Sequence, residues 1–372
     1  MISPDVIVVG AGIVGAACAL QLQSRGRQVL LVDSQFPGGG VTAAGMGHLV
    51  ALDETEDELD LCLLSLKHWD AYLDTRGGLV EHSRCGTLWV AEDEHQLAHA
   101  AARAENLARR GWQASQLTAA QVAAAEPSLR KGLAGGILVG ADSVVYPPAV
   151  ARDLTMQLVA RGGKTMFGAT VAAIGDRSIL LETGLRIDAN DVVLAAGVGV
   201  SRLLPDMPVF PRKGHLAITD RYPGRLSHQI VSMGYGQMPE GSDALAVAAN
   251  VQPRPTGQWL IGSCRQDGID HADVDPSVLA KVLRSAIALL PCLAEMRIIR
   301  SWTGMRPATP DGRPIIGAHP SRAGLWLAGG HEGLGVTTAF GTAQLLADLM
   351  LGQAPALAAD FYSPSRFIHD PA

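Results

Sequence analysis

The chain has 372 residues, 48% of them hydrophobic, which is long enough to bury a sizeable core and to form two domains. Thirty basic and 36 acidic residues give a formal net charge of −6, and no block of five or six like charges occurs. Nucleic acid is therefore excluded as an expected partner, because such a partner requires a basic surface.

We expect no targeting signal and no cysteine-based site in this sequence. Met1 is followed directly by an apolar strand pattern over 6–9, without the basic segment and cleavage site of a secretory signal. No stretch reaches the roughly 18 uninterrupted apolar residues of a membrane span. We expect a cytoplasmic protein without a transmembrane segment, and peripheral membrane attachment is left open. The five cysteines form no Cys-x-x-Cys pair, so we expect reduced thiols and no metal site.

The apolar pattern predicts alternating strands and helices. Residues 5–33 predict a βαβ unit, with a helix over 14–24 and a second strand over 28–32. Downstream we predict a helix over 56–75, a strand over 86–91, helical structure over 94–130, a strand and turn over 136–146, and a helix over 147–161. A buried strand over 191–195, short strands between 213 and 265, a helix over 276–290, and a final strand, turn and helix complete the pattern.

The turn after the first strand has the spacing of a dinucleotide site. Residues 10–15 read Gly-Ala-Gly-Ile-Val-Gly, and Asp33 ends the second strand eighteen residues after Gly15. Gly10 permits the tight turn, Gly12 lets the backbone approach a pyrophosphate, and Gly15 allows close helix–strand packing. The amino terminus of the helix offers N–H groups to phosphates, and Asp33 can accept hydrogen bonds from a ribose. FAD and NAD share this ADP half, so the turn alone does not separate them.

Later segments resemble the D-amino acid oxidase superfamily of FAD-dependent oxidoreductases. Residues 40–46, Gly-Val-Thr-Ala-Ala-Gly-Met, resemble the stretch that runs past the flavin in glycine oxidase and its relatives. Residues 191–197 look like the strand and glycine that pass the FAD in the same proteins. Residues 304–317 and 328–336 are similar to the closing motifs of glycine oxidase, sarcosine oxidase beta subunits, hydrogen cyanide synthase and D-hydroxyproline dehydrogenases, and the Gly-His-Glu-Gly-Leu-Gly form resembles the last most.

The resemblance implies FAD as the cofactor and an α/β fold. It implies a discontinuous, Rossmann-like FAD-binding domain over 1–80, 142–210 and 299–372, and a mostly antiparallel α+β substrate-binding domain over 81–141 and 211–298. Backbone amides in 330–335 are expected to face the pyrimidine edge of the flavin and to stabilise its reduced form. The residues expected to bind the cofactor are Gly10, Ala11, Gly12, Ile13, Val14, Gly15, Asp33, Ser34, Thr42, Ala43, Ala44, Gly45, Met46, Val171, Ala196, Gly197, Arg306, Glu332, Gly333, Leu334, Gly335, Val336 and Thr337.

Substrate binding is expected at Arg306. A flavin takes hydride from the substrate carbon, so the protein mainly holds the substrate and needs no general base of its own. Arg306 matches the Gly-x-Arg-Pro arginine whose guanidinium holds a substrate carboxylate in this family, and the alternative is an arginine in a surface turn forced by the next proline. His48, His331, Asn250 and Arg265 are further candidates for substrate contact, although a lone histidine is more often structural.

The family branch implies cis-4-hydroxy-D-proline or D-proline as substrate, oxidised to a cyclic imine. Several relatives carry an active-site tyrosine near the strand that here reads Ala-Asn-Val-Gln over 249–252, and this departure argues against glycine and sarcosine. The alternatives are a glycine, sarcosine or D-amino acid oxidase that releases hydrogen peroxide, and a non-catalytic flavoprotein subunit. An NAD(P)-dependent dehydrogenase explains the first turn but not the closing motifs. The electron acceptor is open between oxygen, a quinone and a partner subunit.

Overall fold

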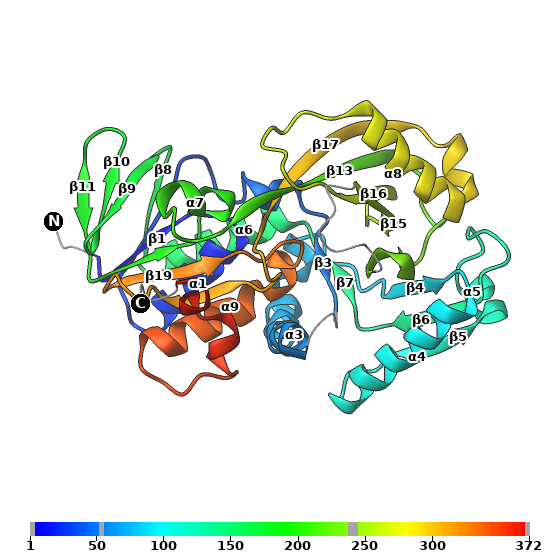
Figure 1. Cartoon of the computed structure of the whole chain (residues 1–372), viewed down its shortest axis with the longest axis horizontal. Coiled ribbons are helices and arrows are strands. Elements are labelled where there is room, and N and C mark those ends of the chain that lie inside the picture. The colour runs from blue at the N-terminus through cyan, green and yellow to red at the C-terminus, as the bar shows by residue number, and fades with distance from the viewer. Residues whose placement is uncertain (1–3, 52–55, 237–244, 369–372) are drawn as a thin grey trace.

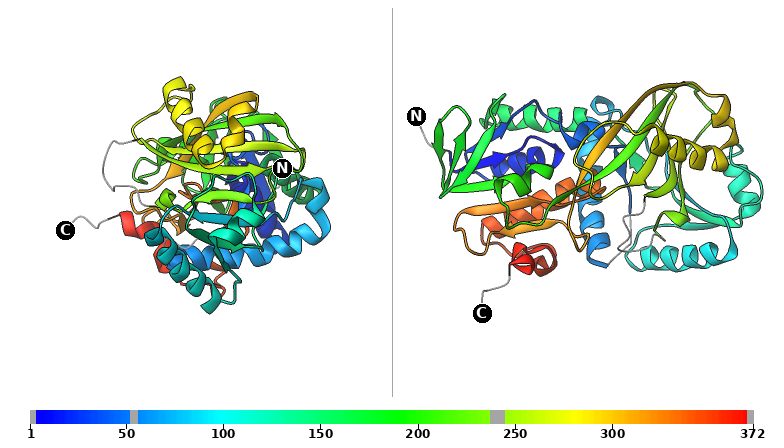
Figure 2. Two further views of the ribbon diagram at one scale, coloured as in Figure 1. Left: turned by 90° about the vertical axis from the view of Figure 1, so that its right-hand side faces the viewer. Right: turned by 45° about the horizontal axis from the view of Figure 1, so that its top comes forward.

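The computed structural model describes residues 4–51, 56–236 and 245–368, which form two lobes along one long axis (Figure 1). Each lobe is built around one large sheet, and the right-hand view of Figure 2 shows the two sheets toward opposite ends of that axis. We call them the first lobe, with a six-stranded sheet, and the second lobe, with an eight-stranded sheet.

The first lobe is a Rossmann-like layer structure. Its sheet has the order β18 (Ile315–Ala318), β19 (Leu325–Gly329), β12 (Asp191–Leu194), β1 (Val6–Val9), β2 (Val29–Asp33) and β8 (Lys164–Phe167). All neighbours pair in parallel except β18 and β19. A parallel sheet is covered on both faces, and β1 is accordingly buried along its whole length.

Different elements cover the two faces of this sheet. Val6 and Val8 belong to one core cluster with four packed helices, α1 (Ile13–Ser24), α3 (Glu56–Arg76), α6 (Pro147–Ala160) and α9 (Gly335–Met350). Ile7 and Val9 face the other way and join a second cluster with the meander β9 (Val171–Gly175), β10 (Ser178–Leu181) and β11 (Arg186–Asp188). The alternation along one short strand thus fixes which side carries the helices.

The second lobe is mostly antiparallel. Its sheet has the order β17 (Ile298–Ala308), β13 (Phe210–Arg221), β16 (Gln258–Arg265), β15 (Ala246–Pro253), β14 (Gln229–Ser232), β4 (Thr87–Ala91), β6 (Gly135–Val139) and β5 (Ser115–Thr118). Only β14 and β4 pair in parallel. Helix α8 (Pro276–Leu289) packs on β13, β15 and β16, and α4 (Glu94–Arg109) and α5 (Ala119–Ala125) lie by β5 and β6.

Two long strands connect the lobes. β13 and β17 pair from Phe210 opposite Ala308 to Thr219 opposite Ile298, and Figure 1 shows both running from the centre into the second lobe. Residues 299–308 were predicted to belong to the cofactor domain, but they lie in the eight-stranded sheet of the second lobe. We therefore propose that the domain boundary follows Ala308, because the backbone pairing of β17 belongs to the second lobe.

Shorter elements complete the chain. They are α2 (Val41–Ala44), β3 (His48–Leu49), β7 (Ser143–Val144), α7 (Val200–Leu203) and the 3-10 turns Gly77–Leu79, Gly197–Gly199, Met233–Gly236, Pro291–Glu295, Ala359–Tyr362 and Pro364–Phe367. β3 pairs with β7 through His48 and Val144. This small pairing holds the chain that leads from the first lobe toward the second.

The predicted long helices are confirmed, with starts that local chemistry explains. Pro147 and Pro148 occupy the first turn of α6, where the missing N–H costs nothing. The Asp275 side chain caps α8 by accepting from the backbone of Ser277 and Val278. The prediction of helical structure over 94–130, with a break at Glu126-Pro127, is confirmed for α4 and α5 and is wrong between them, where β5 lies.

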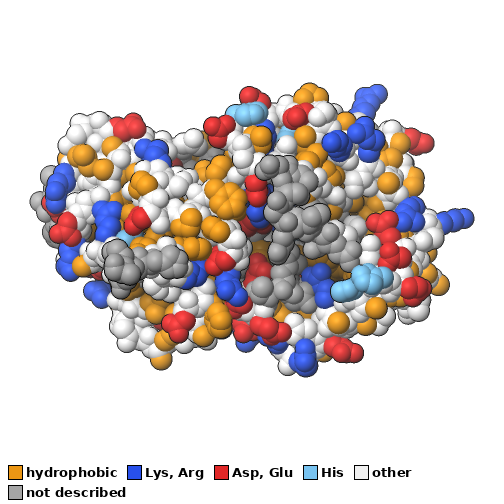
Figure 3. Space-filling model, viewed as in Figure 1, with side chains coloured by type: hydrophobic (Ala, Val, Ile, Leu, Met, Phe, Trp, Pro, Cys, Tyr) orange, Lys and Arg blue, Asp and Glu red, His pale blue; other side chains and the backbone are white. Residues whose placement is uncertain are grey.

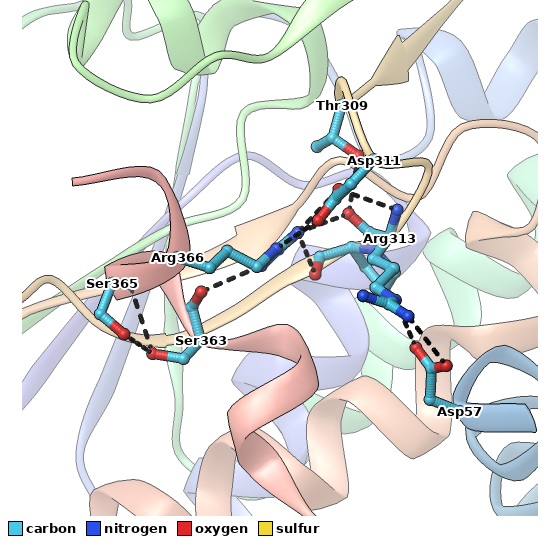
Figure 4. Close-up of polar contacts among 8 residues, drawn as sticks. Asp57, Thr309, Asp311, Arg313, Ser363, Ser365 and Arg366 are labelled. Atoms are coloured by element: carbon cyan, nitrogen blue, oxygen red, sulfur yellow. Dashed lines mark hydrogen bonds and ion pairs between the residues drawn. The ribbon is translucent and has the colours of Figure 1, made fainter. Parts of the chain in front are cut away.

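Part of the closing motif is structural. Arg313 Nε lies 2.7 Å from Asp57 Oδ2 of α3, and Arg366 Nε lies 2.7 Å from Asp311 Oδ2 (Figure 4). The Thr309 hydroxyl donates to the Arg313 carbonyl at 2.7 Å. The Asp-Gly-Arg half of the motif therefore ties α3, the β17–β18 loop and the carboxy-terminal turns together.

The mixed surface charge and the moderate hydrophobicity of the helices agree with the composition. Charges of both signs are interspersed over the face drawn in Figure 3. No helix within 4–51, 56–236 and 245–368 combines the length and apolar character that crossing a bilayer needs.

Candidate functional site

A pocket of about 430 Å³ extends from the glycine turn of the first lobe to the strands of the second. A volume of this order is typical of a small-molecule or cofactor site. The predicted site residues that line it are Gly10, Gly12, Ile13, Val14, Gly15, Asp33, Ser34, Thr42, Ala44, Gly45, Met46, His48, Val171, Ala196, Gly197, Asn250, Arg306, His331, Glu332, Gly333, Gly335 and Val336. Segments far apart in the sequence thus meet in one cavity.

Two of the three glycines in the turn, Gly10 and Gly15, occupy positions where no side chain fits. Gly10 has φ +107, and a Cβ on it would lie 2.3 Å from the Ala195 carbonyl oxygen. A Cβ on Gly15 would lie 1.9 Å from the Gly10 carbonyl oxygen. Gly12 differs, because its Cβ would meet only Thr42 Oγ1, at 3.2 Å, and would enter the pocket. The turn therefore leaves an open cradle at the amino terminus of α1, as phosphate binding requires.

Backbone amides orient the carboxylate of Asp33. Its Oδ2 accepts from the Ala11 backbone at 2.6 Å and its Oδ1 from the Gln35 backbone at 2.7 Å. Each oxygen keeps a further lone pair for a ribose hydroxyl. Ala11 itself is fully buried and does not line the pocket, so it serves Asp33 and not the cofactor directly.

The Arg306 side chain extends from β17 across β13 to hydrogen-bond with β16. It lies on β17 opposite Arg212 of β13, and its guanidinium donates from NH1 to the Cys264 carbonyl at 2.9 Å and from NH2 to Ser263 Oγ at 2.7 Å, both on β16. A Cβ on Gly214 of β13 would lie 2.7 Å from Arg306 NH1. The missing side chain at Gly214 therefore makes room for the guanidinium in the pocket wall.

An acidic side chain balances the neighbouring arginines. Glu332 Oε1 lies 3.3 Å from Arg265 Nε and 3.9 Å from Arg212 NH1, and Arg212 also forms a paired bond with Asp267 at 2.7 and 2.8 Å. Burial acts to raise the pKa of Glu332, but the charges of Arg306, Arg265 and Arg212 outweigh it and hold this pKa below its usual value. Arg265 does not line the pocket. Its charge is directed to Glu332, and not to a substrate.

The two candidate histidines differ in their partners. His48 Nδ1 contacts Gln229 Oε1, and its Nε2 lies 3.3 Å from Asn250 Nδ2 at the pocket. His331 Nε2 lies 2.9 Å from the Thr342 hydroxyl of α9, so this nitrogen is hydrogen-bonded within the first lobe. Burial lowers the pKa of each ring to about 4, so both are neutral near pH 7.

Three other predicted cofactor residues lie outside the pocket lining: Ala43, Leu334 and Thr337. The Thr337 hydroxyl donates to the His48 carbonyl at 3.0 Å, so this side chain holds β3 against α9. The Leu334 carbonyl accepts from Thr338 at the start of α9. Thr337 and Leu334 therefore position the wall of the pocket, because their polar groups bond to β3 and to the first turn of α9.

Sequence reasoning missed several lining residues, chiefly Gly214, Leu216, Ser263 and Arg202. Arg265 was predicted to contact the substrate, but the structure brings its neighbour Ser263 to Arg306 and turns Arg265 toward Glu332. The Cys264 thiol is fully buried, and burial raises its pKa, which makes it unreactive. Its contribution is the backbone carbonyl that Arg306 uses.

A buried carboxyl supports the strand that carries His48. Asp142 is fully buried, its Oδ1 accepts from the Ala51 backbone at 3.1 Å, and burial raises its pKa to about 7. Since this pKa exceeds the unfolded value of 3.8, the stabilisation from the protonated form is complete below about pH 4 and is lost as the pH rises through 7.

Asp142→Asn is therefore expected to gain stability relative to the wild type as the pH rises from 5 to 7.5, by up to about 1.4 kcal/mol per pH unit. Urea unfolding of both proteins across this range measures the difference. A difference that stays constant from pH 5 to 8 would show that the carboxyl is ionised throughout.

The part of the chain that the structure describes contains no candidate metal site. There, no group of three or more His, Cys, Asp or Glu side chains is arranged to hold a metal ion.

The sequence matches a family and its curated members over nearly its whole length. The model of the DAO family, described as FAD dependent oxidoreductase, matches residues 5–349. A glycine oxidase of Pseudomonas aeruginosa is 29% identical, with 98% of this chain and 99% of the relative covered. The hydrogen cyanide synthase subunit HcnC of the same species is 25% identical, with 96% of each chain covered.

Solved structures share the fold. The crystal structure of glycine oxidase from Geobacillus kaustophilus superposes with a TM-score of 0.88 at 25% identity, covering 99% of this chain and all of the other. L-proline dehydrogenase from P. horikoshii gives a TM-score of 0.89 at 20% identity and 98% coverage of both chains, a likeness that concerns the fold alone.

Proposed function

The chain belongs to the DAO family of FAD dependent oxidoreductases, and we propose that it oxidises cis-4-hydroxy-D-proline, or D-proline, to the cyclic imine. As a family member it is an enzyme that uses FAD and acts on the CH–NH or CH–NH2 group of an amino acid. The proposal adds the substrate and the roles of individual residues.

The observation that carries the proposal is the placement of Arg306 in the pocket of the glycine turn. Ser263 and the Cys264 carbonyl fix its guanidinium, and Glu332 takes up the charge of Arg265 beside it. Arg306 is then available to a substrate carboxylate, which its planar fork binds with two charge-assisted bonds. A carboxylate held there lies in the same cavity as the cofactor cradle.

The residues of the first lobe fit FAD. The N–H groups at the start of α1 and the open cradle at Gly12 suit its pyrophosphate, and Asp33 suits its ribose. Bound FAD supplies the hydride acceptor for amine oxidation. The chain holds the substrate with Arg306, keeps His48 neutral and places Asn250 beside it. These groups orient a small imino acid without a protein base.

A cyclic, polar substrate suits the second lobe better than a methylated amine. The chain has only five Tyr and six Phe, so an aromatic cage is not favoured. Asn250 offers an amide at the pocket, and an amide suits a substrate with a hydroxyl or secondary amine. Glycine is the competing substrate, because the relatives at 28–29% identity include proteins named glycine oxidase.

The first test is anaerobic addition of cis-4-hydroxy-D-proline to the purified, FAD-loaded protein. We expect rapid bleaching of the flavin band near about 450 nm, a property that the cofactor brings. Bleaching by glycine or sarcosine alone would transfer the assignment to the competing substrate. Bleaching by no amino acid would favour the non-catalytic subunit.

The electron acceptor is part of the proposal. The acceptor is oxygen, a quinone or a partner subunit, and we propose a cytoplasmic location. Comparing turnover with oxygen and with an artificial quinone separates these acceptors, and stoichiometric hydrogen peroxide would assign the role to oxygen.

Gly214→Ala is expected to impair activity more than folding. The new Cβ would lie 2.7–2.9 Å from the Arg306 guanidinium, the flexible end of a side chain, so the arginine shifts and the backbone stays. A displacement of about 1 Å can lower the rate about a hundredfold. We expect kcat/KM to fall about thirtyfold to a hundredfold, with a Tm close to that of the wild type. Gly140→Ala, at the exposed turn between β6 and β7, is the control for folding, because its Cβ meets open space and its φ is not in the left-handed region. Unchanged kcat/KM in Gly214→Ala would contradict the prediction.

A further inference from the structure

Behind the pocket, polar side chains connect His48 to the interior of the second lobe. They are Gln229 on β14, Asn250 and Gln252 on β15, and Arg254. Gln229 and Gln252 are fully buried, whereas His48 and Asn250 line the pocket. Buried amides are hydrogen-bonded in a definite direction, so each direction follows from the groups at the inner end.

The Ser143 carbonyl and Arg254, at the interior end of this group, determine how the amides of Gln229 and Gln252 are oriented. Gln229 Nε2 donates to the Ser143 carbonyl at 3.3 Å, and since a carbonyl only accepts, Gln229 Oε1 faces His48 Nδ1. Arg254 NH1 donates to Gln252 Oε1 at 3.3 Å. Gln252 Nε2 then donates to Gln229 Oε1, also at 3.3 Å. Gln252 Nε2 also lies 3.4 Å from His48 Nδ1, but the closer partner of Nδ1 is Gln229 Oε1, so the Gln252 amide is directed to Gln229.

These bonds set the tautomer of His48. Gln229 Oε1 can only accept, so His48 Nδ1 carries the proton and Nε2 keeps its lone pair. Burial lowers the pKa of His48 to about 4, and the charges of Arg254 and Arg306 act in the same direction, so the ring is neutral at pH 7. His48 Nε2 therefore accepts from Asn250 Nδ2, 3.3 Å away.

The Asn250 oxygen is left to face a ligand. Oδ1 is buried and has no hydrogen-bond partner among the described residues. A buried acceptor without a partner is costly, so its retention in a pocket points to a partner supplied by the ligand. Asn250 pairs with Gly262, the residue before the Ser263 that holds Arg306, so the oxygen and the guanidinium belong to one pocket wall.

We infer that Asn250 Oδ1 accepts a hydrogen bond from the N–H group of the substrate while the substrate carboxylate lies on Arg306. Gln229 and His48 act as positioning residues that hold the amide with its oxygen outward. The inference rests on the proposed function, since it places an amino or imino acid in this pocket.

The test compares two ligands that are not oxidised. Pyrrole-2-carboxylate and furan-2-carboxylate have the same shape and carboxylate, but only the first has a ring N–H. Calorimetry on the FAD-loaded protein is expected to show that the wild type binds the pyrrole about tenfold more tightly. Asn250→Leu, similar in volume but without an acceptor, is expected to bind both equally. Equal binding by the wild type, or a preference that survives in Asn250→Leu, would overturn the inference.

A second test addresses the chain of hydrogen bonds from Gln229 through His48 to Asn250, which we call the relay. Gln229→Leu removes the acceptor that fixes His48, and we expect it to lose the pyrrole preference while still binding furan-2-carboxylate. Because Gln229 is fully buried, the variant can fail to fold, so ¹⁵N NMR of the His48 ring in the wild type asks the same question. A proton on Nδ1 supports the relay, and a proton on Nε2 overturns it.

The failure of this inference is distinguishable from that of the proposed function. If no imino acid bleaches the flavin but the ligand pair is discriminated, the acceptor role stands and the proposed substrate fails. If cis-4-hydroxy-D-proline is oxidised without discrimination of the pair, the acceptor role alone fails. In Asn250→Leu, an equal loss of kcat/KM with cis-4-hydroxy-D-proline and with D-proline is expected, since both carry the amine, and a loss confined to the hydroxylated substrate would contradict the inference.

Discussion

Arg306→Leu is expected to lower kcat/KM by about a thousandfold for whichever amino or imino acid the wild type oxidises. The change removes two charge-assisted bonds to the carboxylate, each contributing about 1.5–3 kcal/mol, and every 1.4 kcal/mol corresponds to about tenfold. Arg306→Lys keeps the charge but not the fork, and lysine cannot serve Ser263, the Cys264 carbonyl and a carboxylate together. We expect an intermediate loss for lysine, of about thirtyfold.

Stopped-flow reduction under anaerobic conditions measures this effect without the electron acceptor. Arg300→Leu is the matched control, because Arg300 lies on the same strand, is exposed and stacks on Trp302. It removes the same charge from β17 and is expected to change kcat/KM less than about twofold, as a screened surface charge does. Unchanged kinetics in Arg306→Leu, with FAD content equal to the wild type, would exclude Arg306 as the carboxylate anchor.

The parts of the site that the sequence predicted are those built from local contacts. Gly10, Gly15 and Asp33 meet within one βαβ unit, where strand, turn and helix follow each other directly. A spacing rule captures such a site because the geometry depends on few bonds. Arg306 was predicted from a family motif. The other half of that motif, around Arg313, forms an ion pair with Asp57 of α3 and does not contribute to the pocket.

The rest of the site depends on the pairing of distant strands. Gly214 and Ser263 surround Arg306 only because β13 pairs with both β17 and β16, in registers that no single segment contains. β5 was missed for a related reason, since its four residues are mainly exposed and show no apolar alternation at the sheet edge. Hydrophobic patterning predicts elements with a buried face, but it does not give the register between them.

Gly12→Ala is expected to reduce FAD affinity by about thirtyfold to a hundredfold while leaving the apoprotein folded. Gly12 has φ −64, which alanine adopts without strain, and its Cβ would meet only the Thr42 hydroxyl. The methyl group would occupy the cradle and push a pyrophosphate away from the N–H groups of α1, costing about 2–3 kcal/mol of charge-assisted bonding. Fluorescence titration of the apoprotein with FAD measures the affinity, and urea unfolding measures the free energy of unfolding.

Gly10→Ala, two residues away, is the counterpart that separates binding from folding. Its Cβ would lie 2.3 Å from the Ala195 carbonyl oxygen at φ +107, so the pairing of β1 with β12 must shift. We expect a loss of several kcal/mol in the free energy of unfolding even without cofactor. If Gly12→Ala binds FAD as the wild type does, the phosphates do not approach this turn. If Gly12→Ala destabilises the apoprotein as much as Gly10→Ala, Gly12 serves packing, and the cradle at the start of α1 is not a binding feature.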